Sequence, residues 1–263
     1  MKFGMPTLIE CPDLPTCVRE AASRGLDFLE VNLSFPQYRS NVLDPEAMRL
    51  LGEEYGIFYT FHADEQLNPF DFDDRVSDCY MRIMADDIAF AKEVGAPVIN
   101  LHLLTGVYVT LTDRKVYLND VYREDYLKKV QKFIRICEEA IGNSDLKICI
   151  ENVDTCPFTE SQREALRYFL ASPVFALTMD VGHETCLGGK NLDIYCADWS
   201  RRIHMHLHDS DGKRAHLALG DGIVKLDEVL FEPLPKTCLI EVKTLEGLDK
   251  SIETLKRASL FHH

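Results

Sequence analysis

Short apolar runs alternate with longer amphipathic stretches along the whole chain. Runs of about four to eight mostly apolar residues, bounded by turn formers, are typical of strands buried on both faces. The runs predict eight strands: Lys2–Ile9, Asp27–Leu33, Ile57–His62, Pro97–His102, Lys147–Asn152, Val174–Asp180, Arg202–His208 and Thr237–Lys243.

The stretches between these runs carry apolar residues every three or four positions, which predicts helices. Several of them end at a glycine, a usual helix stop. The expected helices are Leu14–Arg24, Pro45–Tyr55, Arg75–Val94, Tyr122–Ile141, Glu160–Leu170, Leu192–Trp199, Leu226–Phe231 and Leu248–Ala258. Segments 63–74 and 103–119 and the glycine-rich segment 182–189 are expected to be loops.

Strands that alternate with helices pair in parallel through right-handed crossovers. Eight such units in 263 residues, with no break in composition and no linker, predict a single domain, residues 1–263, folded as an α/β (β/α)8 TIM barrel. A doubly wound open sheet is the alternative, but the first strand is not followed by a dinucleotide-binding glycine fingerprint. In a barrel, the longer loops after the strands place functional residues at the C-terminal face.

Composition narrows the classes of partner. The net charge of −14, from 29 basic and 43 acidic side chains, argues against binding to nucleic acid through its phosphates. The sequence lacks a signal peptide and any apolar run near the ~20 residues of a membrane span, so we expect no membrane association. The nine scattered cysteines indicate reduced thiols in the cytoplasm. The oligomeric state stays open, and a homo-oligomer is one option.

Residues of metal-ligating type stand at the ends of four consecutive predicted strands. They are Glu151, Asp180, His206 or His208, and Glu241, each about one strand–helix unit from the next. A single glutamate at a strand end more often pairs with a lysine or caps a helix. In a barrel, however, all four would converge on one rim, where carboxylates and an imidazole suit one divalent ion such as Mn, Mg, Co or Zn.

Further candidates could contact a small-molecule carbohydrate substrate. His62 and His102 end two earlier strands and could be either metal ligands or pocket residues. His183 follows the sixth strand, and Gly182 before it would let the backbone turn sharply off the barrel. His216 and Arg214 lie in the loop after the seventh strand, where Arg214 could meet a phosphate or a sugar hydroxyl.

Several short motifs extend this pattern over nearly the whole chain: IEN at Glu151, MDVGH at 179–183, HLHD at 206–209, LGDG at 219–222 and IEV at Glu241. With them the sequence resembles the xylose isomerase-like TIM-barrel superfamily, which includes sugar and sugar-phosphate isomerases and epimerases, and endonuclease IV. The resemblance implies Glu151, Asp180, His206 and Glu241 as the metal ligands. It favours His206 over His208, because the matching motif begins with the ligand.

Neither main branch of this superfamily matches fully. The endonuclease IV branch implies that His62, His102, His183 and His216 join the four ligands around three metal ions, but its remaining aspartate is replaced by Arg214. The ketose epimerase branch expects a glutamate and an arginine where this chain has Pro157 and Gly212.

The sequence therefore predicts a divalent-metal-dependent sugar or sugar-phosphate isomerase or epimerase that acts by proton transfer through an enediolate. Glu151 and Glu241 are the expected catalytic acid and base. The alternatives are an endonuclease IV-like phosphodiesterase acting on abasic DNA, and a sugar-binding barrel without turnover.

Overall fold

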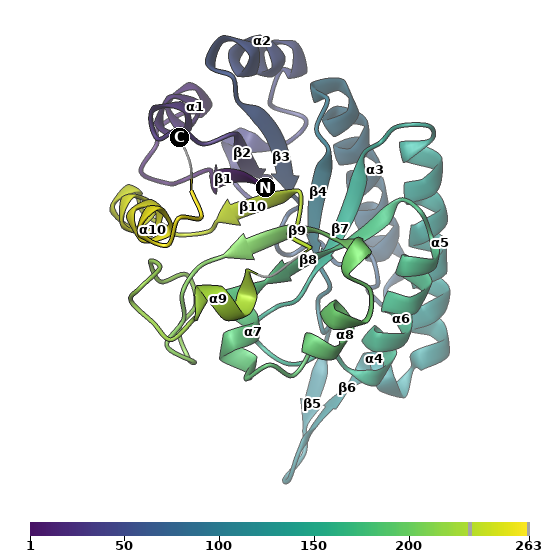
Figure 1. Cartoon of the computed structure of the whole chain (residues 1–263). Helices are drawn as coiled ribbons and strands as arrows, with labels where there is room; N and C mark the ends of the chain where they lie inside the picture. Colours follow the sequence, from purple (N-terminus) through teal and green to yellow (C-terminus); the bar gives the residue numbers. More distant parts are fainter. Residues whose placement is uncertain (231–232, 262–263) are drawn as a thin grey trace.

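Eight parallel strands close into a barrel in the computed structural model, which describes residues 1–230 and 233–261 (Figure 1). Each strand pairs with its neighbours along the chain, and β1 closes the barrel by pairing with β10. The structure thus confirms the predicted TIM barrel. The barrel strands are β1 Lys2–Pro6, β2 Phe28–Asn32, β3 Phe58–His62, β4 Val98–His102, β7 Lys147–Glu151, β8 Phe175–Asp180, β9 Arg202–Leu207 and β10 Thr237–Ile240.

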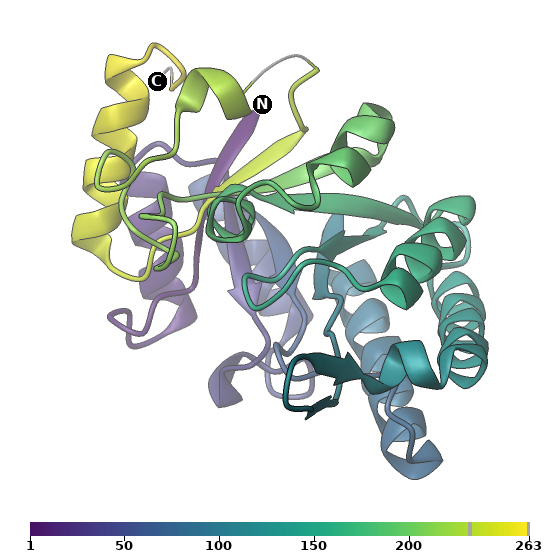
Figure 2. The same ribbon diagram turned by 90° about the horizontal axis from the view of Figure 1, so that it is seen from below.

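The helices lie around the outside of the barrel (Figures 1 and 2). Local capping explains many of their starts: the Asp44 carboxylate accepts from the backbone of α2, and a Thr159–Gln162 capping box opens α6. Gly95 ends α3 with φ 83°, as predicted. The helices are α1 Leu14–Ser23, α2 Pro45–Tyr55, α3 Asp74–Val94, α4 Leu118–Val121, α5 Arg123–Ile141, α6 Glu160–Ala171, α7 Val181–Leu187, α8 Leu192–Ala197, α9 Leu226–Val229 and α10 Leu245–Arg257, with 3-10 turns η1 Pro36–Tyr38 and η2 Trp199–Arg201.

Two segments expected to be loops contain regular structure. Within 103–119, β5 (Tyr108–Thr110) and β6 (Lys115–Tyr117) form an antiparallel hairpin that projects from the barrel (Figure 1). Most of 182–189 belongs to α7, which begins at Val181 directly after β8, where the Asp180 carboxylate caps it by accepting from the His183 backbone N–H. The helix predicted to end at Phe231 ends at Val229, and Phe231 itself lies outside the described residues.

Apolar side chains hold the helices against the outer face of the barrel. Phe70 contacts Phe133 edge to face, Phe133 contacts Phe169, and Phe169 packs on Phe175 at 4.8 Å between ring centroids. The loop before α3, α5, α6 and β8 thus share one aromatic cluster. The barrel interior differs from this outer core, because buried polar side chains line it toward the carboxyl ends of the strands. No helix in the described ranges is long and apolar enough to cross a membrane.

Candidate active site

Four strand ends bring together the predicted metal ligands Glu151, Asp180, His206 and Glu241. One ligand atom from each lies within 4.8 Å of the others, and all four side chains are buried. His206 Nδ1 is central, at 3.0 Å from Glu151 Oε1, 3.1 Å from Glu241 Oε2 and 3.7 Å from Asp180 Oδ2. We call these four residues the rim cluster.

The rim cluster fits a divalent cation. Glu151 Oε1, Glu241 Oε2 and His206 Nδ1 are buried and lack a hydrogen-bond partner, although they face one another. Buried charges of this kind are costly unless they are paired or bind a metal. Three carboxylates and one imidazole form an oxygen-rich donor set that suits Mn, Mg, Co or Zn.

The electrostatics of the rim cluster also favour a bound cation. Burial alone would raise the pKa of Glu151, but the charges of His206 and His102 outweigh it and hold the pKa well below its ordinary value. Burial also opposes the charged form of His206, yet the surrounding carboxylates raise the pKa of this imidazole well above its usual range. The pocket therefore favours positive charge at its centre, which a bound cation would supply.

Hydrogen bonds to both its side chain and its backbone fix the position of Asp180. Its carboxylate accepts from the His183 backbone N–H at 2.6 Å and lies 3.0 Å from His208 Nε2. Asn152 bonds the backbone of Asp180, accepting from its N–H at 2.9 Å and donating to its C=O at 3.0 Å. Gly182 allows the close approach of His208, because a Cβ there would lie 1.9 Å from the imidazole ring.

His62 and His102 contact the other oxygen of Glu151. Their Nε2 atoms lie 3.4 and 3.1 Å from Glu151 Oε2. His62 Nδ1 donates to the Ala63 carbonyl at 2.7 Å, so the neutral His62 ring offers an Nε2 lone pair on the side of Glu151. These three residues could hold a second cation, with Glu151 bridging the two positions.

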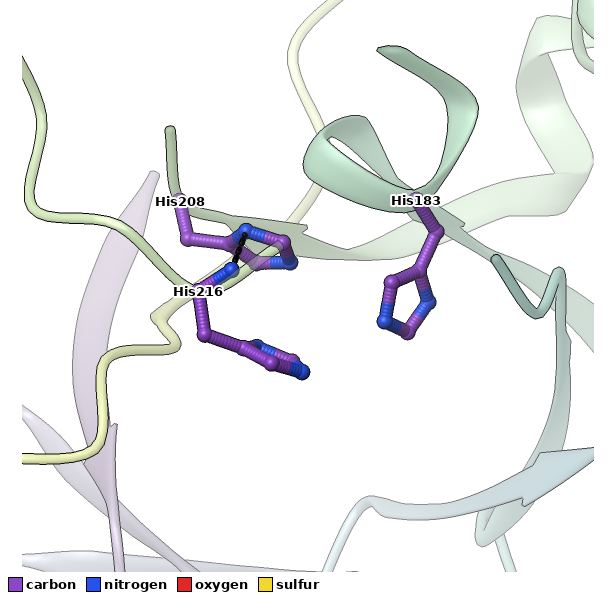
Figure 3. Close-up of side chains that lie close together, drawn as sticks. All are labelled: His183, His208 and His216. Carbon is purple, nitrogen blue, oxygen red and sulfur yellow. Dashed lines mark hydrogen bonds between the residues drawn. The ribbon is translucent and has the colours of Figure 1, made fainter. Parts of the chain in front are cut away.

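A further group of histidines lies beside Asp180 (Figure 3). His208 has no free nitrogen, because Nδ1 accepts from the His216 backbone N–H at 2.8 Å and Nε2 faces Asp180. His183 Nδ1 faces the Asn152 carbonyl at 3.0 Å, and the rings of His183 and His216 project into the same space. Two of the three histidines are thus available to a ligand.

Arg214 does not reach the rim cluster. Its side chain is exposed and pairs with Asp211 at 2.8 Å, within the same loop. It therefore stays apart from the four histidines predicted with it as substrate-binding residues.

A cleft opens beside the rim cluster, with Glu241 in its lining. It consists of two adjoining hollows of about 400 and 500 Å³, which share His62, Glu65, Glu241 and Lys243. The predicted residues His62, His102, His183 and His216 all line the larger hollow. The cleft lies at the carboxyl ends of the strands, where TIM-barrel enzymes place their active sites.

Sequence reasoning missed several charged residues of this cleft, among them Lys243 and Glu30. Lys243, just past β10, lies with Nζ 2.9 Å from Glu241 Oε1. Glu30, in the middle of β2, lies under the rim cluster with Oε1 3.0 Å from His206 Nε2. The only available signal for Glu30 was a carboxylate inside the apolar strand FLEVN.

Comparison with known proteins places the chain in a family. Residues 18–257 match the model of the xylose isomerase-like TIM barrel, and the chain belongs to this family. No curated protein matches the chain in sequence.

Solved structures of the same fold include proteins with different activities. A D-tagatose 3-epimerase-like protein is 22% identical with a TM-score of 0.73, covering 98% of this chain and 96% of its own. The IOLI protein, with a bound zinc atom, is 17% identical with a TM-score of 0.73, covering 99% and 97%. Endonuclease IV from Thermus thermophilus is 19% identical with a TM-score of 0.68, covering 99% of both chains. At these identities the similarity establishes the fold.

Proposed function

We propose that the protein is a divalent-metal-dependent isomerase or epimerase of a polyhydroxy aldehyde or ketone. The observation that carries the proposal is the rim cluster of unpaired ligand atoms, one member of which, Glu241, lines the adjoining cleft. The family membership and the epimerase-like structural neighbour support the same reaction class. A bound divalent ion supplies Lewis acidity, which makes the proton next to a substrate carbonyl easier to remove.

Glu151 and Glu241 are the proposed acid and base. They come from β7 and from the end of β10, and their carboxylate oxygens lie 3.0 and 3.1 Å from His206 Nδ1. One carboxylate removes the proton from the carbon next to the carbonyl and leaves an enediolate. The other, in its protonated form, gives a proton to the opposite face of that carbon, which yields an epimer. If the proton goes to the former carbonyl carbon and the hydroxyl proton moves to the former carbonyl oxygen, the product is an isomer.

The charge of the cleft favours a neutral sugar over a phosphate ester. Four acidic residues line the two hollows: Glu30, Glu65, Asp154 and Glu241. Among the described lining residues, Lys243 is the only lysine or arginine. Lys243 is already paired with Glu241, which leaves no free lysine or arginine in the described lining to neutralise a phosphate. The histidines that line the larger hollow can instead form hydrogen bonds with hydroxyl groups, which both donate and accept.

Deuterium uptake tests this proposal. In heavy water, the Mn²⁺-loaded protein is expected to exchange the α-proton of at least one sugar in a panel of free and phosphorylated aldoses and ketoses, measured by proton NMR. Glu151→Gln is expected to slow exchange by about 10²–10⁴-fold, the usual contribution of a general acid or base. Glu138→Gln is the matched control. Glu138 lies on the outer helix α5, where its carboxylate accepts from the Ser172 hydroxyl, and this variant is expected to keep the wild-type exchange rate. No uptake with any sugar would refute the proposal.

A metal-dependent phosphodiesterase is the second candidate. The observation that favours it is the group of His62, His102 and Glu151, which could add a second cation to the site. It predicts two bound ions per chain and nicking of a duplex that contains an abasic site. One ion per chain and an intact duplex would support the isomerase.

We also propose that the protein acts in carbohydrate metabolism in the cytoplasm. All nine cysteines are free thiols in the structure, which suits a reducing compartment.

A further inference from the structure

A chain of buried polar residues runs beneath the rim cluster, inside the barrel. Glu30 on β2 is 1% exposed and reaches across the interior to β9. Its Oε1 lies 3.0 Å from His206 Nε2, and its Oε2 lies 3.0 Å from His204 Nε2. Thr60 donates to the same Oε2 at 2.8 Å, and His204 Nδ1 lies 2.6 Å from the Thr237 hydroxyl.

Glu30 favours one of the two protonation sites of a neutral His206 ring. Its buried carboxylate lies 3.0 Å from Nε2, so a proton on this nitrogen is stabilised by the negative charge of Glu30. With the proton on Nε2, His206 Nδ1 carries a lone pair. That lone pair faces the oxygens of Glu151 and Glu241 at 3.0 and 3.1 Å, an arrangement that is repulsive unless a cation lies between them.

We propose that Glu30 is a positioning residue for the metal centre, which fixes the tautomer and ring orientation of His206 so that Nδ1 binds the ion. Carboxylates that accept from the second nitrogen of a metal-bound histidine strengthen metal binding in this way. Thr60 and His204 hold the other oxygen of Glu30 and so keep its carboxylate turned toward His206. The inference rests on the proposed metal centre and adds to it a residue outside the ligand set.

The test is metal binding by Glu30→Gln. Glutamine keeps the shape and one acceptor oxygen but removes the charge, so we expect the dissociation constant for Mn²⁺, measured by titration calorimetry, to rise by about 10- to 100-fold. The visible absorption bands of the Co²⁺-loaded protein should also change, because they report the geometry around the ion.

Asp87→Asn is the matched control. Asp87 is another buried carboxylate, 4% exposed, bonded to Ser40 and away from the cleft. This variant makes the same chemical change and is expected to keep the wild-type Mn²⁺ affinity and Co²⁺ spectrum.

Thr60→Val provides an independent variant if Glu30→Gln does not fold. Valine is nearly isosteric and removes only the hydroxyl that holds Glu30 Oε2, so we expect a several-fold rise in the Mn²⁺ dissociation constant. A folded Glu30→Gln protein with wild-type affinity and spectrum would overturn the inference, and so would wild-type affinity in Thr60→Val. Wild-type protein that binds no Mn²⁺ would overturn the metal centre itself, whereas normal binding in wild type and variants alike would overturn only the role of Glu30.

Discussion

Glu151 is the residue at which the clusters of the site meet. One of its oxygens faces His206 within the rim cluster, and the other faces His62, His102 and the side-chain amide of Asn100. A fully buried carboxylate is stabilised only by such partners. Substitution of this residue therefore removes the group that links the proposed metal position to the histidines of the cleft.

Asp87 is a buried carboxylate that is stabilised less strongly than Glu151, by a hydrogen bond from the Ser40 hydroxyl. Burial raises its pKa from an ordinary value of 3.8 to about 6, and the Ser40 hydroxyl only partly offsets this effect. The folded protein therefore binds a proton at Asp87 between these pH values, where the unfolded chain has released it. Stability accordingly falls as the pH rises through this window.

Asp87→Asn is expected to remove this part of the pH dependence. Since one pKa unit corresponds to about 1.4 kcal/mol, the variant should gain about 2–3 kcal/mol of unfolding free energy relative to wild type between pH 4 and pH 6. Urea unfolding at several pH values measures this difference. Asp145→Asn, at an exposed carboxylate, is the control, and its unfolding free energy should depend on pH as in wild type. The same pH dependence as wild type in Asp87→Asn would contradict the account.

The junction of β8 and α7 is the element on which the site depends most. Asp180 is both the last residue of the strand and the cap of the helix, so one carboxylate fixes the backbone and joins the rim cluster. The glycines of this segment predicted a loop because glycine is a poor helix former. Gly182 is present for a different reason, which is the approach of His208 from the neighbouring strand end. Such a contact between distant segments leaves no local signal in the sequence.

Gly182→Ala is expected to weaken both the fold and the metal site. The added Cβ would lie 1.9 Å from the His208 ring, so the ring must move, at about 1–3 kcal/mol of unfolding free energy. Displacing His208 also frees the Asp180 carboxylate, so the Mn²⁺ dissociation constant should rise several-fold.

Gly56→Ala separates the two effects. Its Cβ would meet no atom within 4 Å, and its cost comes from the positive φ of 70° alone, about 1–2 kcal/mol of unfolding free energy. Urea unfolding without metal and Mn²⁺ calorimetry compare the two variants. Unchanged Mn²⁺ affinity in Gly182→Ala would refute the role given to His208.

At the scale of the whole molecule, the barrel was predictable because its signal repeats. Short apolar runs alternate with helical stretches, and parallel pairing places successive strand ends at one rim. The ligand-type residues Glu151, Asp180, His206 and Glu241 could therefore be expected to converge. Glu30 could not be predicted in the same way, because its contacts cross the barrel interior between β2 and β9. Arg214 is the opposite case. Its position in the loop after the seventh predicted strand suggested contact with substrate, but its side chain is exposed and pairs with Asp211 in the same loop.

The central claim is that the rim cluster binds a divalent cation, and anomalous diffraction at the manganese edge tests it most directly. Crystals grown with MnCl₂ are expected to show an anomalous peak within coordinating distance of Glu151, Asp180, His206 Nδ1 and Glu241. A second peak at His62 and His102 would indicate the two-ion site of the phosphodiesterase alternative. A map with no peak among the four residues, or with its only peak elsewhere, would contradict the account.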